Sequence, residues 1–268
     1  MPEQVDLYDG HYGQLSTDVQ REVRAETYDE DLGQSSWITA AEGREWFDLL
    51  GLDAAGRALE VACGSGGMTC AMARHTGASC TGIDINPHGI EAATARAARD
   101  GLASRVTFEL VDGSRRLPYG DASFDAVFSN DAINHLPNRA ATLQDWARVL
   151  RPGGRLLFTD PCVVTGPLTS DEMRERSAIG FYLFMPAGLN EPLLKHAGLD
   201  LKEVRDVTGA VATVSRAWHD ARARRRARLV TLEGDEAFQG LQRFLTAVHV
   251  LSSERRLSRF MYLAEKRA

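Results

Sequence analysis

The stretch Leu59-Glu-Val-Ala-Cys-Gly-Ser-Gly-Gly-Met-Thr69 decides the fold, because in it a short apolar strand runs through a glycine turn into a helix. Glycines such as Gly64 and Gly66 let the backbone approach a ligand, and the N–H groups at the start of the helix point toward it. A dinucleotide-binding fingerprint would place a further glycine where this chain has Thr69. The stretch therefore predicts a ligand-binding α/β domain and disfavours its pyrophosphate-binding version.

Around this turn, short apolar runs alternate with helical stretches, which is typical of parallel strands joined by crossover helices. We expect strands at Ala58–Cys63, Ala78–Ile85, Val106–Val111, Phe124–Ser129, Arg155–Thr159, Leu199–Val207 and Leu257–Ala264. We expect helices between the early strands at Met68–Arg74, Pro87–Arg99 and Ala140–Leu150. The pattern predicts a doubly wound, seven-stranded Rossmann-like α/β sheet, with ligands at the carboxyl ends of the strands.

The two ends of the chain add to this core, and we expect all parts to form one structural domain. Residues 1–52 are predicted to be an N-terminal helical cap, in which Thr39-Ala-Ala-Glu42 has the spacing of a capping box. Residues 53–160 form the core, and residues 161–268 hold the remaining strands and inserts that could act as a substrate lid. Between the last two strands, helical spacing predicts two helices around Gly234, with the arginine run 222–228 on a solvated face.

The composition of the chain argues against several kinds of binding partner. The 268 residues hold 31 Lys and Arg against 37 Asp and Glu, a net charge of −6, which argues against binding nucleic acid through bulk phosphate attraction. No apolar run approaches the roughly 20 residues of a membrane-spanning helix, and the first residues do not resemble a secretory leader. The four cysteines are scattered without metal-ligand spacing. We expect a cytoplasmic protein without metal, nucleic-acid or membrane partners; an oligomer is possible.

Acidic side chains recur where predicted strands end. Asp84 ends the second strand, Asp112-Gly113 follows the third, and Ser129-Asn-Asp131-Ala-Ile-Asn-His135 follows the fourth. A carboxylate at the end of the second strand can accept both ribose hydroxyls of a nucleoside. Together with the glycine turn, these residues predict one ligand site at this edge of the sheet.

The order of these motifs, completed by Leu-Pro-Tyr-x-x-x-Ser-Phe-Asp125 and Leu-Arg-Pro-Gly-Gly154, resembles class I S-adenosylmethionine-dependent methyltransferases over roughly residues 55–160. The resemblance implies S-adenosylmethionine as cofactor. It implies that Gly64 and Gly66 face the methionine end, Asp84 holds the ribose, and Asp112 with Gly113 contacts the adenine. The remaining cofactor residues that it implies are Glu60 near the methionyl ammonium, Ala62 through its carbonyl, Ile85, Asn130, Gln34 and Trp37.

Within that family the layout is most similar to phosphoethanolamine methyltransferases and related small-molecule enzymes. In those relatives the histidine of the Asp131-Ala-Ile-Asn-His135 motif works with an N-terminal tyrosine, which implies catalytic roles for His135 and for Tyr8 or Tyr12. Histidine is also the side chain best able to accept a proton near pH 7. The phosphobase enzymes carry Arg where this chain has Asn130, so we do not expect a phosphorylated acceptor.

The leading hypothesis is methyl transfer to an O or N atom of a small molecule, such as a metabolite or natural-product intermediate. Methylation of carbon on a small apolar acceptor is the closest alternative. A non-catalytic S-adenosylmethionine-binding protein would keep Asp84 and Asp112 without needing His135. An NAD(P) dehydrogenase should carry glycine at position 69, where this chain has Thr69.

Overall fold

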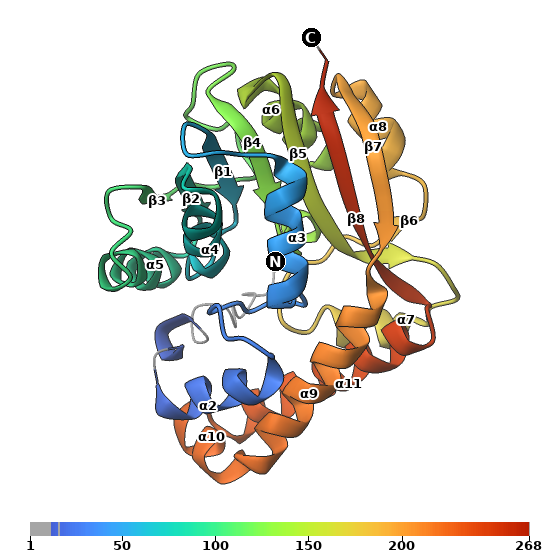
Figure 1. Ribbon diagram of the computed structural model, residues 1–268. Coiled ribbons are helices and arrows are strands. Elements are labelled where there is room, and N and C mark those ends of the chain that lie inside the picture. The colour runs from blue at the N-terminus through green and yellow to red at the C-terminus, as the bar shows by residue number, and fades with distance from the viewer. Residues whose placement is uncertain (1–11, 16, 268) are drawn as a thin grey trace.

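The computed structural model describes residues 12–15 and 17–267, which build an eight-stranded sheet with helices on both faces (Figure 1). The strand order is β3-β2-β1-β4-β5-β8-β7, and β6 pairs with β5 off this path. Strands β1 to β5 are parallel, whereas β8 lies antiparallel to both β5 and β7. The strands are β1 (Arg57–Val61), β2 (Ser79–Asp84), β3 (Val106–Leu110), β4 (Phe124–Ser129), β5 (Leu150–Val164), β6 (Met185–Pro186), β7 (Leu199–Asp206) and β8 (Leu257–Lys266).

The predicted α/β fold is confirmed, with one addition to the sheet. The seven expected strands form the main path, and β6 is an eighth that the sequence did not reveal. It has only two residues, Met185 and Pro186, which is too short to give a recognisable period. Strand β5 is also longer than expected, because its pairing with β4 starts at Leu150 and resumes after a register shift.

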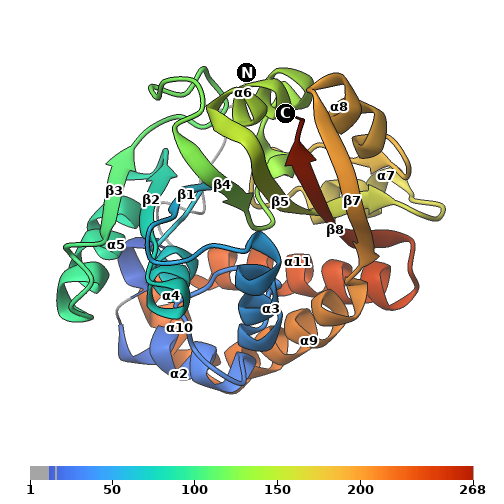
Figure 2. The same cartoon turned by 45° about the horizontal axis from the view of Figure 1, so that its top comes forward.

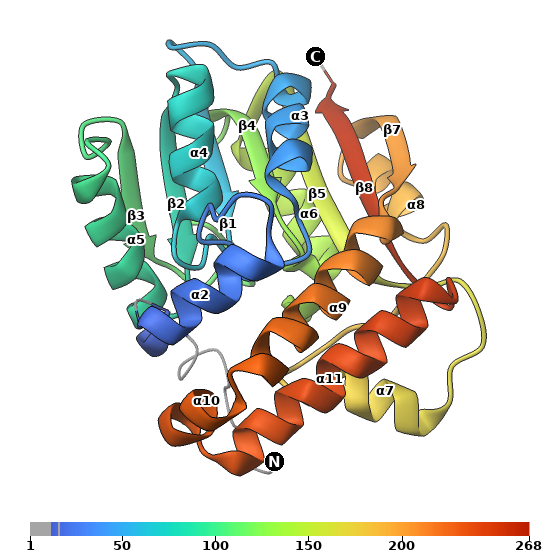
Figure 3. The same cartoon turned by 60° about the horizontal axis from the view of Figure 1, so that its bottom comes forward.

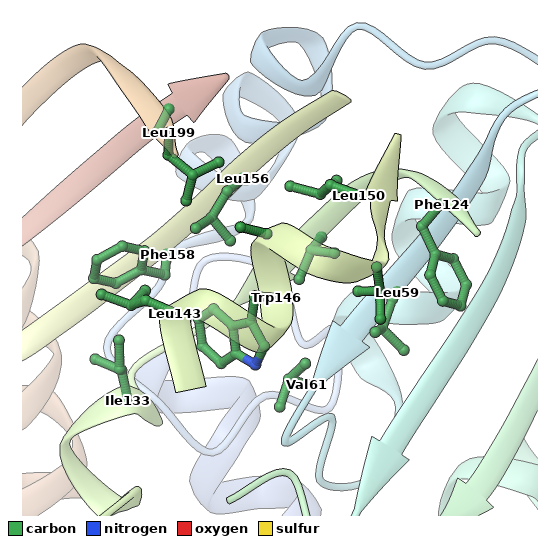
Figure 4. Packing of buried hydrophobic residues seen from close by; sticks show 14 of the residues in the cluster. Leu59, Val61, Phe124, Ile133, Leu143, Trp146, Leu150, Leu156, Phe158 and Leu199 are labelled. Carbon is green, nitrogen blue, oxygen red and sulfur yellow. The ribbon is translucent and has the colours of Figure 1, made fainter. Parts of the chain in front are cut away.

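Side-chain alternation along the strands gives the sheet two apolar faces. Leu59 and Val61 of β1 belong to a cluster built on Trp146 of α6, whereas Ala58 belongs to a cluster on the opposite face that includes Trp46. Figure 4 shows Trp146 surrounded by side chains from β1, β4 and β5. Helices α3 (Ala40–Leu50), α4 (Gly67–Thr76) and α5 (Pro87–Arg99) cover one face, and α6 (Arg139–Val149) and α8 (Asn190–His196) cover the other (Figure 2).

Local signals set the helix ends. Gly51 ends α3 in a left-handed conformation, and Asn86 caps α5 by accepting a hydrogen bond from the Gly89 amide. The capping box at Thr39 is only half formed. Thr39 accepts from the Glu42 amide, but the Glu42 carboxylate turns away to Arg259. A long-range ion pair has therefore replaced the second bond of the box.

The N-terminal cap and the C-terminal insert pack together beyond the carboxyl ends of the parallel strands (Figure 3). One buried cluster joins Tyr28 and Trp37 from the N-terminal region, Ile179 from the segment after β5, and Val211 and Phe244 from the insert. The helices involved are α2 (Asp18–Thr27), α7 (Ser170–Arg176), α9 (Thr208–Arg224), α10 (Arg226–Glu233) and α11 (Asp235–Ser253). The predicted helical insert between the last two strands is thus present; its role as a lid stays a prediction.

Two details of this insert differ from the expectation. It holds three helices, because the chain leaves helical geometry at Arg225, between α9 and α10, as well as at Gly234. The arginine run is not simply a solvated face. Arg222 is fully buried and paired with Glu233, and Arg225 donates to carboxylates of α2. The run therefore attaches the insert to the N-terminal helix.

All four cysteines are free thiols and are buried. No helix in the part of the chain that the structure describes is long and apolar enough to cross a bilayer.

Candidate functional site

The turn between β1 and α4 requires glycine at two positions. Gly64 and Gly66 have φ values of 53° and 72°, the left-handed region that side chains disfavour. A Cβ on Gly66 would overlap the Phe108 ring, and one on Gly64 would lie 2.5 Å from the Tyr12 hydroxyl. The turn can therefore pack this closely only without side chains, and Tyr12 lies directly against it.

Asp84 holds this turn against the end of β2. Its Oδ2 accepts a hydrogen bond from the Gly64 amide and its Oδ1 accepts one from the Asn86 amide, each at 2.8 Å. The side chain is buried, yet two apolar neighbours at the same edge are not: Ile85 is 67% exposed and Leu110 is 58% exposed. An acid flanked by exposed apolar surface suits a ligand with a hydroxylated part and a flat apolar part.

A small pocket of about 60 Å³ lies between the glycine turn and the N-terminal loop around Gly33–Ser36. Two hydrogen bonds join this loop to the strand ends: Ser65 donates to the Gly33 carbonyl at 2.8 Å, and Asn130 Nδ2 donates to Ser36 Oγ at 2.6 Å. The pocket is lined by Tyr12, Gly33, Gln34, Ser35, Ser36, Glu60, Ala62, Cys63, Gly64, Ser65, Gly67, Met68 and Asn130.

Glu60 is the one acidic residue among those described that line this pocket. Its carboxylate accepts a hydrogen bond from the Thr69 hydroxyl, which explains why threonine rather than glycine stands at position 69. Burial raises the pKa of Glu60 to about 8, and the nearby charge of Asp84 acts in the same direction. The group therefore binds a proton at neutral pH unless a cation approaches it.

Asp112 and Gly113 lie at the next strand end. Although burial opposes ionisation of Asp112, hydrogen bonds from Ser114 and Arg115 lower its pKa overall. A Cβ on Gly113 would lie 2.7 Å from the Val61 side chain, so glycine allows this turn to approach the end of β1. The two residues thus border the same edge of the sheet as Asp84.

A buried ion-pair cluster, which the sequence analysis missed, joins Glu42, Asp131 and Arg259. Arg259 of β8 has no exposed surface, and it donates through Nε to Asp131 and through Nη1 to Glu42, each at 2.6 Å. Asp131 adopts a φ of 53° directly after Asn130. One signal was available: Arg259 lies in a strand whose central residues are mostly apolar, and a buried arginine needs an acid.

His135 lies in the 3-10 turn Ile133–His135, away from the small pocket. Its Nδ1 is 2.7 Å from the Phe181 carbonyl, which can only accept, so Nδ1 carries the proton and Nε2 the lone pair. Although part of the ring reaches solvent, the atoms packed around it lower its pKa to about 4. Tyr182 meets the ring edge to face at 4.5 Å, and Arg176 lies 4.6 Å from the Tyr182 ring centre.

The predicted site residues therefore fall into groups. Tyr12, Gln34, Glu60, Ala62, Gly64 and Asn130 line the pocket, and Asp84 is bonded to its glycine turn. Trp37 does not line it: its ring packs against Trp218 and Phe244 of the insert, and only its amide reaches toward the site, donating to Asp131. Tyr8 lies outside the described residues. Within those residues, no cluster of three His, Cys, Asp or Glu could hold a metal ion.

Comparison with known proteins shows that the chain is similar to methyltransferases. A family model described as a methyltransferase domain matches residues 59–158. The 27-O-demethylrifamycin SV methyltransferase of Amycolatopsis mediterranei is 37% identical over 164 residues, which cover 60% of each chain. O-methyltransferase rstn1 of Aspergillus nomiae is 30% identical over 213 residues, 77% of this chain and 94% of that one. The chain spans about three fifths of the length of the bacterial relatives it matches.

The fold is shared with a solved structure. Haemonchus contortus phosphoethanolamine N-methyltransferase 2, in complex with phosphomonomethylethanolamine and S-adenosylhomocysteine, has a TM-score of 0.81 at 21% identity. The match covers all of this chain and 62% of the other. At that identity the likeness concerns the fold alone.

Ala62 offers a test of the turn's backbone. Its φ of 60° is strained for alanine, because a left-handed conformation costs an L-residue roughly 1–2 kcal/mol. Ala62→Gly should therefore raise the free energy of unfolding by about 0.5–1 kcal/mol after the extra entropy of the unfolded glycine chain is deducted. Urea denaturation measures the change.

Ala58→Gly is the matched control, since Ala58 lies four residues earlier in β1 and is not among the residues with positive φ. In that variant the free energy of unfolding should fall by about 0.5–1 kcal/mol or more. Equal destabilisation by both substitutions would mean that Ala62 is not strained.

Proposed function

This chain belongs to the class I S-adenosylmethionine-dependent methyltransferases, and from that premise we propose that it methylates an oxygen or nitrogen atom of a small natural-product molecule. The two relatives described above, a 27-O-demethylrifamycin SV methyltransferase and an O-methyltransferase, favour oxygen. The observation that carries the proposal is the hydrogen bond from the Gly64 amide of the glycine turn to Asp84, next to the exposed Ile85. Methylation of carbon, and binding without catalysis, are the outcomes that would replace it.

The residues at the strand ends fit the cofactor. The glycines at 64 and 66 let the turn keep its left-handed backbone against Tyr12 and Phe108. The Asp84 carboxylate suits ribose hydroxyls, and the exposed Ile85 suits an adenine face. Asp112 and Gly113 would border the adenine. When bound, S-adenosylmethionine supplies an electrophilic methyl group on a positively charged sulfur.

Glu60 and its neighbours would receive the methionine end. A carboxyl group whose pKa is about 8 is held neutral by burial, and a nearby ammonium favours its ionised form. Glu60 would therefore lose its proton as a cation enters. The Ala62 carbonyl and Gln34 line the same pocket and would hold the cofactor there.

His135 is the proposed base. Because Nδ1 is bonded to the Phe181 carbonyl, Nε2 is the atom that would accept the proton from an acceptor hydroxyl. A pKa of about 4 keeps the ring neutral, and so able to accept, at physiological pH. Tyr12, whose hydroxyl lies beside Gly64, and Tyr8 would orient the acceptor or cofactor.

The acceptor should be substantially apolar. The cluster that joins the N-terminal region to the inserts holds Trp37, Tyr182 and Phe244, and Arg176 packs over the last two rings. We propose that residues 1–52 and the inserts within 161–268 cover the acceptor and exclude water.

The free buried cysteines suit a reducing compartment, and we place the enzyme in the cytoplasm.

The direct test is incubation with methyl-labelled S-adenosylmethionine and a panel of hydroxylated and aminated acceptors of graded size, followed by mass spectrometry. We expect label on an oxygen or nitrogen of the larger, more apolar members. Label on carbon would support the alternative chemistry, and binding of S-adenosylhomocysteine without transfer to any acceptor would support a non-catalytic protein.

Asp84→Ala should weaken S-adenosylmethionine binding at least tenfold, since two charge-assisted hydrogen bonds of about 1.5–3 kcal/mol each are at stake. It should also lower stability, because the Gly64 and Asn86 amides lose their acceptor. Asp145→Ala is the control: this carboxylate accepts from the Leu117 amide at 2.7 Å and should affect stability alone. Unchanged calorimetric affinity of the Asp84 variant would remove Asp84 from the site.

His135→Asn should lower kcat about 10²- to 10⁴-fold while leaving cofactor affinity within twofold, because asparagine can still donate to the Phe181 carbonyl but cannot act as the base. With a folded pKa near 4, wild-type kcat/KM for the acceptor, measured at saturating S-adenosylmethionine, should stay level as pH falls from 8 to about 5. An ordinary histidine would lose activity around pH 6.5.

His249→Asn is the matched control, because His249 Nδ1 also bonds a carbonyl, that of Ala212, at 2.9 Å. It should keep normal turnover. Normal turnover of the His135 variant instead would show that positioning suffices without this base.

A further inference from the structure

We infer that Arg259 is a positioning residue. It holds the N-terminal loop around Gly33–Ser36 and the start of the insert at Val207 and Thr208 in one arrangement, and it thereby sets the affinity for the cofactor. The inference rests on the proposed function, because the affinity concerned is that for S-adenosylmethionine. Arg259 lies in β8 with no exposed surface and outside the residues that line the pocket. Its effect would therefore act through the groups it contacts.

The side chain of Arg259 binds the strand end that borders the pocket. Nε donates to Asp131 at 2.6 Å and Nη2 donates to Asn130 Oδ1 at 3.1 Å. Asn130 in turn donates through Nδ2 to Ser36 Oγ at 2.6 Å, and both residues line the pocket. Asp131 accepts from the Trp37 amide at 3.0 Å. The guanidinium thus fixes two acceptors, each of which holds one residue of the N-terminal loop.

The backbone of the same residue binds the start of the lid. The Arg259 carbonyl accepts from the Val207 amide at 2.9 Å, and the Arg259 amide donates to Thr208 Oγ1 at 3.0 Å. Thr208 is the first residue of α9. The Trp37 ring packs against Trp218 of α9 and Phe244 of α11. The N-terminal loop therefore contacts the insert directly as well as through Arg259.

Charge and hydrogen-bond geometry together make this arrangement specific for arginine. Arg259 lies between two buried acids, since Nη1 also donates to Glu42 at 2.6 Å. Glu42 Oε2 is buried without a hydrogen-bond partner within the described residues, and burial raises the pKa of this group. A lysine would keep the charge, but its ammonium is a point donor that cannot reproduce the planar fork to Asp131, Asn130 and Glu42.

The experiment compares Arg259→Lys with Arg139→Lys in the full chain. Arg139 is the matched control, because it is also buried, pairs with the buried Asp160, and donates to Asn190 Oδ1 at 2.8 Å outside the pocket. The readouts are the Kd for S-adenosylhomocysteine by calorimetry, the Tm, and amide exchange at residues 34–37.

We expect both variants to lower the Tm, but only Arg259→Lys to weaken S-adenosylhomocysteine binding at least tenfold and to speed exchange at residues 34–37. Unchanged affinity in Arg259→Lys, or equal weakening in both variants, would overturn the inference. If wild-type protein binds no S-adenosylhomocysteine, the proposed function falls and the inference falls with it.

A milder variant covers the case in which Arg259→Lys does not fold. Glu42→Gln keeps an oxygen acceptor for Arg259 but removes one buried charge, and its side chain does not line the pocket. It should weaken S-adenosylhomocysteine binding at least threefold. Affinity equal to that of wild type would overturn the inference.

Discussion

The left-handed backbone between β1 and α4 is the constraint on which the site depends. Within five residues the chain takes positive φ at Ala62, Gly64 and Gly66. This backbone turns the chain sharply from the end of β1 into α4. The Gly64 amide then faces Asp84. Because β1 lies between β2 and β4, the carboxyl ends of all three strands lie at this edge of the sheet, where we propose that the cofactor binds.

A second constraint comes from charge. The cap, the strand ends and the lid are separate in sequence, and the Arg259 cluster joins them where water is excluded. Removing one partner of such a pair leaves the others buried and uncompensated, so the arrangement is held more rigidly than surface ion pairs would hold it. The exposed contacts between α2 and the arginine run attach the outer end of the lid with weaker, screened interactions.

The fold was largely predictable from sequence, because apolar runs and glycine or asparagine caps are local signals, as at Asn86 and Gly51. The family also followed from motif order. The errors arose where contacts are distant or elements short. Arg259 and Asp131 are 128 residues apart, and Glu42 satisfies a capping-box pattern although its carboxylate serves Arg259. No period predicts a two-residue strand such as β6, and a run of arginines does not show which member, here Arg222, is buried.

We propose that this edge of the sheet binds S-adenosylmethionine. The most direct measurement is the thermal unfolding of wild-type protein with S-adenosylhomocysteine and, separately, with NAD. A ligand present at a hundred times its Kd stabilises the folded state by about 2.7 kcal/mol. The account predicts a Tm that rises with S-adenosylhomocysteine concentration and does not change with NAD; a rise with NAD alone, or with neither ligand, would contradict it.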